Sequence, residues 1–292
     1  MTDRVEILEV GPRDGLQNEA VMIPAEDKIR LVNHLSHSGL THIEVTSFVS
    51  PKWVPQMADA AEVMAGISRH PDVTYAVLTP NLRGLEGALA ADANEVAVFG
   101  AASEGFSQKN INCTIAESLA RFEPVMALAR ENNLPVRGYV SCVVACPYDG
   151  KTAPEMVKQV ALSLLEMGCY EISLGDTIGA GHPDDIKHLL DHLIPHIPAA
   201  KLAGHFHDTG NRALANVDAA MTYGLRRFDS AVGGLGGCPY APGAKGNLGT
   251  MLLAQHLHDQ GYETGLDLDR LAEAEQLIQS FHLAPKSDQE AM

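Results

Sequence analysis

The stretch APEMVKQVALSLLEMGCYEISLG, residues 153–175, contains the pattern that decides the fold. Its first part places four apolar residues at helical spacing, which predicts a helix with one face toward a core. Gly168 then supplies the left-handed cap that ends a helix, and a β-like run follows directly. The segment therefore predicts a helix that turns back through glycine into a strand. The four apolar residues are Met156, Val160, Leu164 and Met167.

This order of elements recurs along the chain of 292 residues, with Gly39 and Gly224 in the place of Gly168. Eight β-like runs are each followed by a helix-like segment, which predicts an α/β protein with a closed (β/α)8 TIM barrel. No Pro/Ser-rich linker interrupts the chain, so we expect a single domain over residues 1–292, with the last ~25 residues as a C-terminal helical tail. The β-like runs are 5–10, 42–48, 73–79, 95–101, 136–143, 170–175, 201–207 and 227–232.

The alternative fold is an open, doubly wound sheet. A dinucleotide-binding fold of that kind would carry a GxGxxG motif after its first strand. The first predicted strand leads instead into VGPRDGLQNE, so the barrel is favoured.

Composition narrows the classes of partner. The formal net charge of −16 disfavours nucleic acid and anionic membranes. No run of about 18 apolar residues appears, so no membrane span is expected, and the N-terminus lacks the basic and apolar regions of a secretory signal. Five cysteines without a CxxC pair favour a reducing cytoplasm over a disulfide framework.

In barrels of this type the active site lies at the carboxyl ends of the strands. Closure would make the seventh, eighth, first and second strands neighbours, so polar residues at these carboxyl ends would converge on one mouth. The polar residues are Arg13 and Asp14 after the first strand, Glu44 in the second, His205 and His207 in the seventh, and Cys238 and Asn247 beyond the eighth, with Asp176 at the end of the sixth strand beside them.

His205 and His207 are two residues apart, a spacing that directs both side chains to one face of a strand. Two such imidazoles can chelate a divalent ion, although an isolated pair fits two surface or capping histidines equally well. Asp14 on a neighbouring strand end favours the metal site. Arg13 forms either a surface ion pair with Asp14 or a group that stabilises a developing oxyanion, and Glu44 is expected to brace it.

The run GGLGGCPYAPGAKGNLG, residues 233–249, is too rich in glycine for a core strand and too long for a simple turn. It is compatible with a flexible connector. A single cysteine in a Gly/Pro loop above the predicted metal site, Cys238, is instead typical of a mobile lid that carries an acid/base thiol.

Taken together, these motifs closely resemble the hydroxymethylglutaryl-CoA lyase family, from about residue 4 to about residue 282. They are similar in part to the wider group of metal-dependent barrel lyases and synthases. The segment around Cys238 is the most specific part of the resemblance. The motifs are VGPRDGLQNE (10–19), AASE…NIN (101–112), YVSCVVACPYDG (139–150), LGDTIG (174–179), GHFHDT (204–209) and GGLGGCPYAPGAKGNL (233–248).

The resemblance implies a role for each site residue. A divalent cation, Mg²⁺ or Mn²⁺, would be held by Asp14, His205, His207 and Asn247. Arg13 would stabilise an enolate with support from Glu44, and Cys238 would be the catalytic loop cysteine. His205 and Asp176 would take part in acid/base catalysis. The implied reaction is the retro-Claisen cleavage of 3-hydroxy-3-methylglutaryl-CoA to acetyl-CoA and acetoacetate. Its general base stays open between His205, Asp176 and a water molecule.

Two departures from the family pattern lie near the mouth. Ala20 stands where relatives often have lysine, and Gly210 and Asn211 replace tyrosine or arginine followed by glycine. They leave the acyl specificity open to citramalyl-CoA or a longer ester such as 3-isohexenylglutaryl-CoA.

Two rival functions are a Claisen-type synthase and a non-catalytic metal-binding barrel. Synthases of this group usually carry a C-terminal regulatory domain, for which the ~25 residues after Gly265 would leave no room. We therefore expect a cytoplasmic enzyme with an acyl-CoA substrate and no nucleic-acid or membrane partner. The resemblance further implies a homodimer or a higher homo-oligomer.

Overall fold

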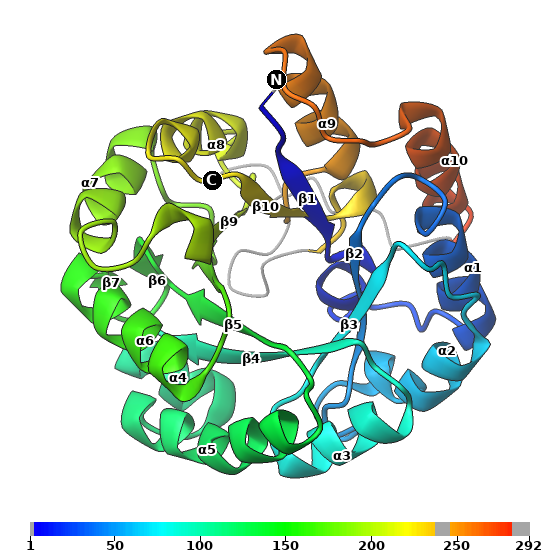
Figure 1. The fold of residues 1–292 in the computed structure, drawn as a ribbon, viewed down its shortest axis with the longest axis horizontal. Coiled ribbons are helices and arrows are strands. Elements are labelled where there is room, and N and C mark those ends of the chain that lie inside the picture. Colours follow the sequence, from blue (N-terminus) through cyan, green and yellow to red (C-terminus); the bar gives the residue numbers. More distant parts are fainter. Residues whose placement is uncertain (1–2, 237–245, 282–292) are drawn as a thin grey trace.

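The predicted β-like runs pair side by side in a computed structural model of the chain, which describes residues 3–236 and 246–281. Among these residues, eight parallel strands close into a barrel in the order β1-β10-β9-β8-β5-β4-β3-β2. Helices surround this ring on the outside (Figure 1). The TIM barrel prediction is confirmed. The strands are β1 (Glu6–Glu9), β2 (His42–Ser47), β3 (Thr74–Leu78), β4 (Glu95–Ala101), β5 (Val136–Ser141), β8 (Ile172–Asp176), β9 (Leu202–Phe206) and β10 (Arg227–Ser230).

The helices bury one apolar face each against the strands. In α6 the fully buried residues include Val160 and Leu164, as predicted, whereas Met156 and Met167 are only partly buried at its edge. The helices are α1 (Ala25–Leu35), α2 (Ala60–Gly66), α3 (Leu82–Ala90), α4 (Glu104–Ile111), α5 (Ile115–Glu131), α6 (Pro154–Met167), α7 (Pro183–Leu193), α8 (Ala213–Thr222), α9 (Thr250–Asp259) and α10 (Leu268–Gln279).

Gly168 ends α6 as the predicted left-handed cap, with a φ angle of +116°. Gly224 and Gly39 also have positive φ angles, +90° and +84°, but they lie in the connections after α8 and α1, whose last residues are Thr222 and Leu35. Most strands are one or two residues shorter than the predicted runs. In the fifth run the reason is local, because β5 ends at Ser141 and Cys142 has a φ angle of +60°. That left-handed conformation takes Cys142 out of the ladder.

Short elements at the carboxyl ends of the strands shape the mouth of the barrel. A π-helix, η1 (Gly11–Gly15), follows β1, and a 3₁₀ turn, η4 (Val232–Gly234), follows β10. A two-stranded hairpin, β6 (Ala145–Cys146) with β7 (Gly150–Lys151), follows β5. Two more 3₁₀ turns are η2 (Pro55–Met57) and η3 (Ala199–Lys201).

The predicted C-terminal helix is present as α10, which packs beside α1 on the outside of the barrel (Figure 1). The rest of the predicted tail, 282–292, lies outside the described residues. Within the described residues, none of the helices has the length and apolar character that a membrane crossing requires.

Replacing Gly39 with alanine tests the close approach between α1 and the segment before α10. A Cβ atom at Gly39 would lie 2.1 Å from the carbonyl oxygen of Gly265, whereas a Cβ atom at Gly150 would meet no atom within 4 Å. Both glycines have a φ angle near +80°, so Gly150→Ala is a matched control for backbone strain. We expect Gly150→Ala to lower the free energy of unfolding by about 1 kcal/mol and Gly39→Ala by about 2 kcal/mol more. Equal losses in urea titrations would contradict the proposed clash.

Candidate active site

Arg13 and Asp14 lie on η1, directly after β1. The Nη1 atom of Arg13 donates to the Oδ1 atom of Asp14 at 2.5 Å, and its Nε atom donates to the Oε2 atom of Glu44 at 2.6 Å. Glu44 comes from the neighbouring strand β2, and Arg13 is only 5% exposed. The guanidinium is therefore held between two carboxylates, one of which is the residue that the sequence predicts as its brace.

His205 lies on β9 and His207 follows the strand directly. Their ring centroids are 5.4 Å apart, so the two side chains share one face. One potential ligand atom from each of Asp14, His205 and His207 lies within 4.8 Å of the other two. The buried Nδ1 atom of His207 has no hydrogen-bond partner among the described residues. An orphaned ring nitrogen beside a carboxylate and a second imidazole fits a divalent cation.

Asn247 completes this group. It pairs with His207 in an isolated β-bridge, and its Nδ2 atom donates to the Oδ2 atom of Asp14 at 2.9 Å and to the carbonyl oxygen of Leu235 at 3.1 Å. These bonds leave the amide oxygen as the atom with which Asn247 would bind a cation. Oxygen atoms from Asp14 and Asn247 with two imidazoles suit Mg²⁺ or Mn²⁺ better than a closed zinc site.

The electrostatics of Asp14 and His207 favour the protonation states that bind a metal. Burial raises the pKa of Asp14, but the positive charge of Arg13 and the histidines outweighs it and lowers the pKa to about 2. Burial lowers the pKa of His207 to about 4, with help from His205. Asp14 is therefore ionised and His207 neutral near neutral pH, as coordination requires.

A further carboxylate, Asp229 on β10, sets the orientation of His205. The Nδ1 atom of His205 donates to the Oδ2 atom of Asp229 at 3.0 Å, which leaves its Nε2 atom on the side of Asp14. Burial lowers the pKa of His205, but the hydrogen bond to Asp229 and the negative charges of Asp229 and Asp14 together outweigh burial and raise it. A histidine that donates through one ring nitrogen to a carboxylate presents the other nitrogen to a metal.

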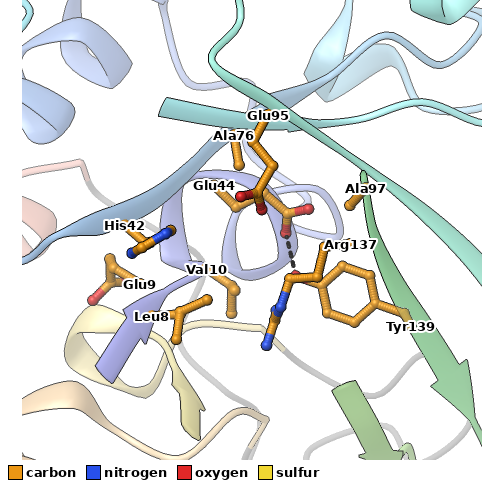
Figure 2. Close-up of a pocket in the computed structure, with 10 residues that line it drawn as sticks. All are labelled: Leu8, Glu9, Val10, His42, Glu44, Ala76, Glu95, Ala97, Arg137 and Tyr139. Atoms are coloured by element: carbon orange, nitrogen blue, oxygen red, sulfur yellow. Dashed lines mark hydrogen bonds between the residues drawn. The ribbon is translucent and has the colours of Figure 1, made fainter. Parts of the chain in front are cut away.

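Asp229 is in turn held by Arg137 on β5, at 2.8 Å and 3.1 Å. Arg137 also donates to the hydroxyl of Tyr139 at 3.1 Å, and that hydroxyl donates to the Oε2 atom of Glu44 at 3.2 Å. Figure 2 shows Glu44, Arg137 and Tyr139 converging inside the barrel. The cavity that they line has a volume of only about 10 Å³, so side chains fill the barrel below the mouth. A continuous hydrogen-bonded chain thus connects His205 to Arg13.

Sequence reasoning did not assign a role in the site to Asp229 or Arg137. Arg137 is the one charged residue of VRGYVSCV, and Asp229 is one of two in RFDSAV, beside Arg227. A charge inside a strand of a barrel must be paired with an opposite charge. A charged residue inside a predicted barrel strand therefore indicates a buried ion pair. The sequence does not show which acidic residue pairs with which arginine.

Asp176 is fully buried at the end of β8. Its oxygens accept the backbone N–H groups of Ala180 and Gly181 at 3.2 Å and 2.8 Å, so the carboxylate shapes the connection to α7. Burial raises the pKa of Asp176. It is not part of the group formed by Asp14, His205 and His207. Cys238 lies outside the described residues.

Comparisons with known proteins agree on one family. The family model HMGL-like matches residues 4–278. The chain is 56% identical over 278 residues to a rat protein named "3-hydroxy-3-methylglutaryl-CoA lyase, cytoplasmic", covering 95% of this chain and 81% of the relative. It is 55% identical over 275 residues to a Pseudomonas aeruginosa protein named "3-hydroxy-3-isohexenylglutaryl-CoA/hydroxy-methylglutaryl-CoA lyase", covering 94% and 92%.

A solved crystal structure has the same fold as this chain. The crystal structure of the HMG-CoA lyase from Brucella melitensis superposes with a TM-score of 0.94 at 57% sequence identity, covering 95% of this chain and 98% of the other. Sequence and structure therefore indicate the same family.

Replacing Asp229 with asparagine tests the orientation of His205. Loss of the carboxylate charge weakens the hydrogen bond that orients His205, and it removes one of the two acidic partners of Arg137. Because a less well oriented His205 binds a cation more weakly, we expect the affinity for Mn²⁺ to fall about 10- to 100-fold. Isothermal titration calorimetry measures this affinity directly. Ser173→Ala is the matched control, because Ser173 donates to the same oxygen at 2.7 Å and its loss leaves the carboxylate that His205 donates to. Wild-type affinity in Asp229→Asn would show that Asp229 does not position His205.

Proposed function

The chain belongs to the HMGL-like family, and we propose that it is a divalent-metal-dependent carbon–carbon lyase that cleaves 3-hydroxy-3-methylglutaryl-CoA to acetyl-CoA and acetoacetate. The names of its relatives support this reaction. The observation that carries the proposal is the juxtaposition of Asp14, His205 and His207 with the buried guanidinium of Arg13. These groups provide a cation site beside a fixed positive charge.

The substrate contains a tertiary hydroxyl group, and its cleavage needs that group activated. A divalent cation held by Asp14, His205, His207 and Asn247 would polarise the hydroxyl and orient the free carboxylate. A base then takes the hydroxyl proton. His205, Asp176 and a water molecule remain the candidates, and the raised pKa of Asp176 brings that carboxylate closer to the range in which a base works near neutral pH.

The bond that breaks joins the hydroxyl-bearing carbon to the carbon next to the thioester. Its electron pair moves onto the thioester as an enolate, and the alkoxide becomes the ketone of acetoacetate. We assign the stabilisation of the enolate oxygen to Arg13, whose charge is fixed by Glu44 and Asp14 before any substrate binds. Cys238 is proposed to donate the proton that completes acetyl-CoA.

The same mechanism fits a longer acyl chain. One relative carries both 3-hydroxy-3-isohexenylglutaryl-CoA and hydroxymethylglutaryl-CoA in its name. Ala20 is exposed and Gly210 half-buried on segments that follow η1 and β9. Each of these two residues stands where the family pattern has a larger side chain, whereas Asn211 stands where it has glycine. The longer ester is therefore the second substrate that we propose, ahead of citramalyl-CoA and of a synthase reaction.

Location and assembly are proposed on the resemblance alone. The rat relative is named as a cytoplasmic protein, and we propose the same location for this chain. We also propose a homodimer or a higher homo-oligomer, which sedimentation velocity would measure.

Acetyl-CoA release is the direct test of the function. We expect cleavage of 3-hydroxy-3-methylglutaryl-CoA with Mg²⁺ or Mn²⁺, and loss of that activity with a chelator because the cation polarises the reacting oxygen. The same assay with the isohexenyl ester and citramalyl-CoA ranks the substrates by kcat/KM. Cleavage of none of the three esters by metal-loaded protein would refute the lyase proposal.

Replacing Cys238 with alanine separates a lyase from a barrel that only binds metal. We expect kcat to fall at least about 100-fold through loss of the proton donor, with the Mn²⁺ affinity and Tm unchanged. Cys169→Ala is a control, because this buried cysteine lies near the start of β8. Full activity of Cys238→Ala in reducing buffer would contradict the assigned role.

A further inference from the structure

Glu9 is a fully buried carboxylate on β1 that the proposed mechanism does not use. Figure 2 shows its side chain directed away from the barrel interior, on the opposite side of the strand from Leu8 and Val10. Its Oε1 atom accepts the backbone N–H groups of Gly11 at 2.7 Å and Val232 at 2.9 Å. Its Oε2 atom accepts the hydroxyl of Thr250 at 2.6 Å. One side chain thus joins three segments.

Each of the three segments leads to the candidate active site. Gly11 begins η1, which carries Arg13 and Asp14. Val232 begins η4, which precedes Leu235 in the sequence. Thr250 begins α9, which follows Asn247. Thr250 is also bonded to Ser230 at 2.8 Å. Glu9 therefore ties Val232 and Thr250, which lie three residues from Leu235 and Asn247, to the turn that bears Asp14.

Close contacts also join η1 to Leu235 and Asn247, so the position of one depends on the position of the other. Asn247 donates to Asp14 and to Leu235, and a Cβ atom at Gly15 would lie 2.7 Å from the Cβ atom of Leu235. Gly11 is equally confined, since a Cβ atom there would lie 2.5 Å from the Oε1 atom of Glu9. Small shifts at the level of Glu9 would consequently change the separation of Asp14 and Asn247.

We propose that Glu9 is a positioning residue for the metal site, which holds Asp14 on η1 and Asn247 on the opposing segment at the separation that a divalent cation needs. The inference rests on the proposed function for its link to turnover, but the metal affinity alone can test it. Glu9 touches neither the cation site nor the groups assigned to the reaction.

Substitutions at Glu9 can separate its hydrogen bonds from its charge. In Glu9→Gln the amide oxygen still accepts both backbone N–H groups and the amide nitrogen donates to Thr250, so we expect most of the Mn²⁺ affinity to remain. In Glu9→Leu both N–H groups lose their acceptor, and we expect the Mn²⁺ affinity to fall about tenfold or more. For turnover, we expect a lower kcat with a nearly unchanged KM for the ester. Calorimetry and steady-state kinetics on the full chain give these values.

A second pair of variants covers the case in which Glu9→Leu does not fold. Thr250→Val removes the hydroxyl's bonds to Glu9 and to Ser230 but keeps the side-chain volume, whereas Thr250→Ser keeps that hydroxyl. We expect a lower Mn²⁺ affinity in Thr250→Val and wild-type affinity in Thr250→Ser. Equal affinities in these two variants, or wild-type affinity in folded Glu9→Leu, would overturn the proposal. Absence of lyase activity in the wild type would refute the proposed function and leave this metal-binding test intact.

The pH dependence of stability provides a readout that is independent of turnover. Burial raises the pKa of Glu9 to about 7, and the hydrogen bonds from Thr250, Val232 and Gly11 oppose this shift. The charged group that acts on it is Glu275 of α10, which raises it further. Between the unfolded pKa of 4.5 and about 7 the folded state keeps the proton that the unfolded state loses, so this group's contribution to stability falls as pH rises. We expect the Tm of Glu9→Gln, relative to wild type, to increase from pH 5 to pH 8. A constant difference would contradict the assigned environment of Glu9.

Discussion

The buried guanidinium of Arg137 is the interaction on which the interior of the barrel depends. It is 2% exposed and pairs with Asp229 on one side and Glu171 on the other. A charge in this position is tolerated only when it is paired and its hydrogen bonds are satisfied. Through Asp229 it reaches His205, and through Tyr139 it reaches Glu44 and then Arg13. The geometry of the candidate active site is therefore fixed from below, by strands rather than by loops.

The charges of this network also support the proposed cation site. The two buried arginines, Arg13 and Arg137, form ion pairs with four carboxylates, so negative charge exceeds positive charge within the group. Arg227 compensates only in part, because it is shared between Glu171 and Glu6. A bound divalent ion would balance the remaining charge at the end where Asp14 lies. The four carboxylates are Asp14, Glu44, Glu171 and Asp229.

Residues that act through local spacing could be predicted from the sequence. A period of two residues predicts the strands and the shared face of His205 and His207, and a period of 3.6 residues predicts the helices. Glycine after a helix predicts its end, and the repetition of these elements predicts the barrel. The pairing of Arg137 with Asp229 could not be predicted, because the two residues are 92 positions apart and several acids lie on other strands. The π-helical form of η1 was equally hidden, since GPRDG contains no helical period.

The candidate active site lies where β1 and β10, the first and last strands of the barrel, pair with each other. The site can therefore form only when the barrel closes. Asp14 and Asn247 are 233 positions apart, and Glu9 and Thr250 are 241 positions apart. Bringing such distant segments together costs chain entropy, which grows by about 0.6 kcal/mol with each doubling of the loop. A cation that binds ligands from both ends of the chain recognises only the closed barrel, and it stabilises that state by mass action. The proposed metal site would thus form one cooperative unit with the closure between β1 and β10, supported by Glu9 on β1 and, through Asp229 on β10, by Arg137.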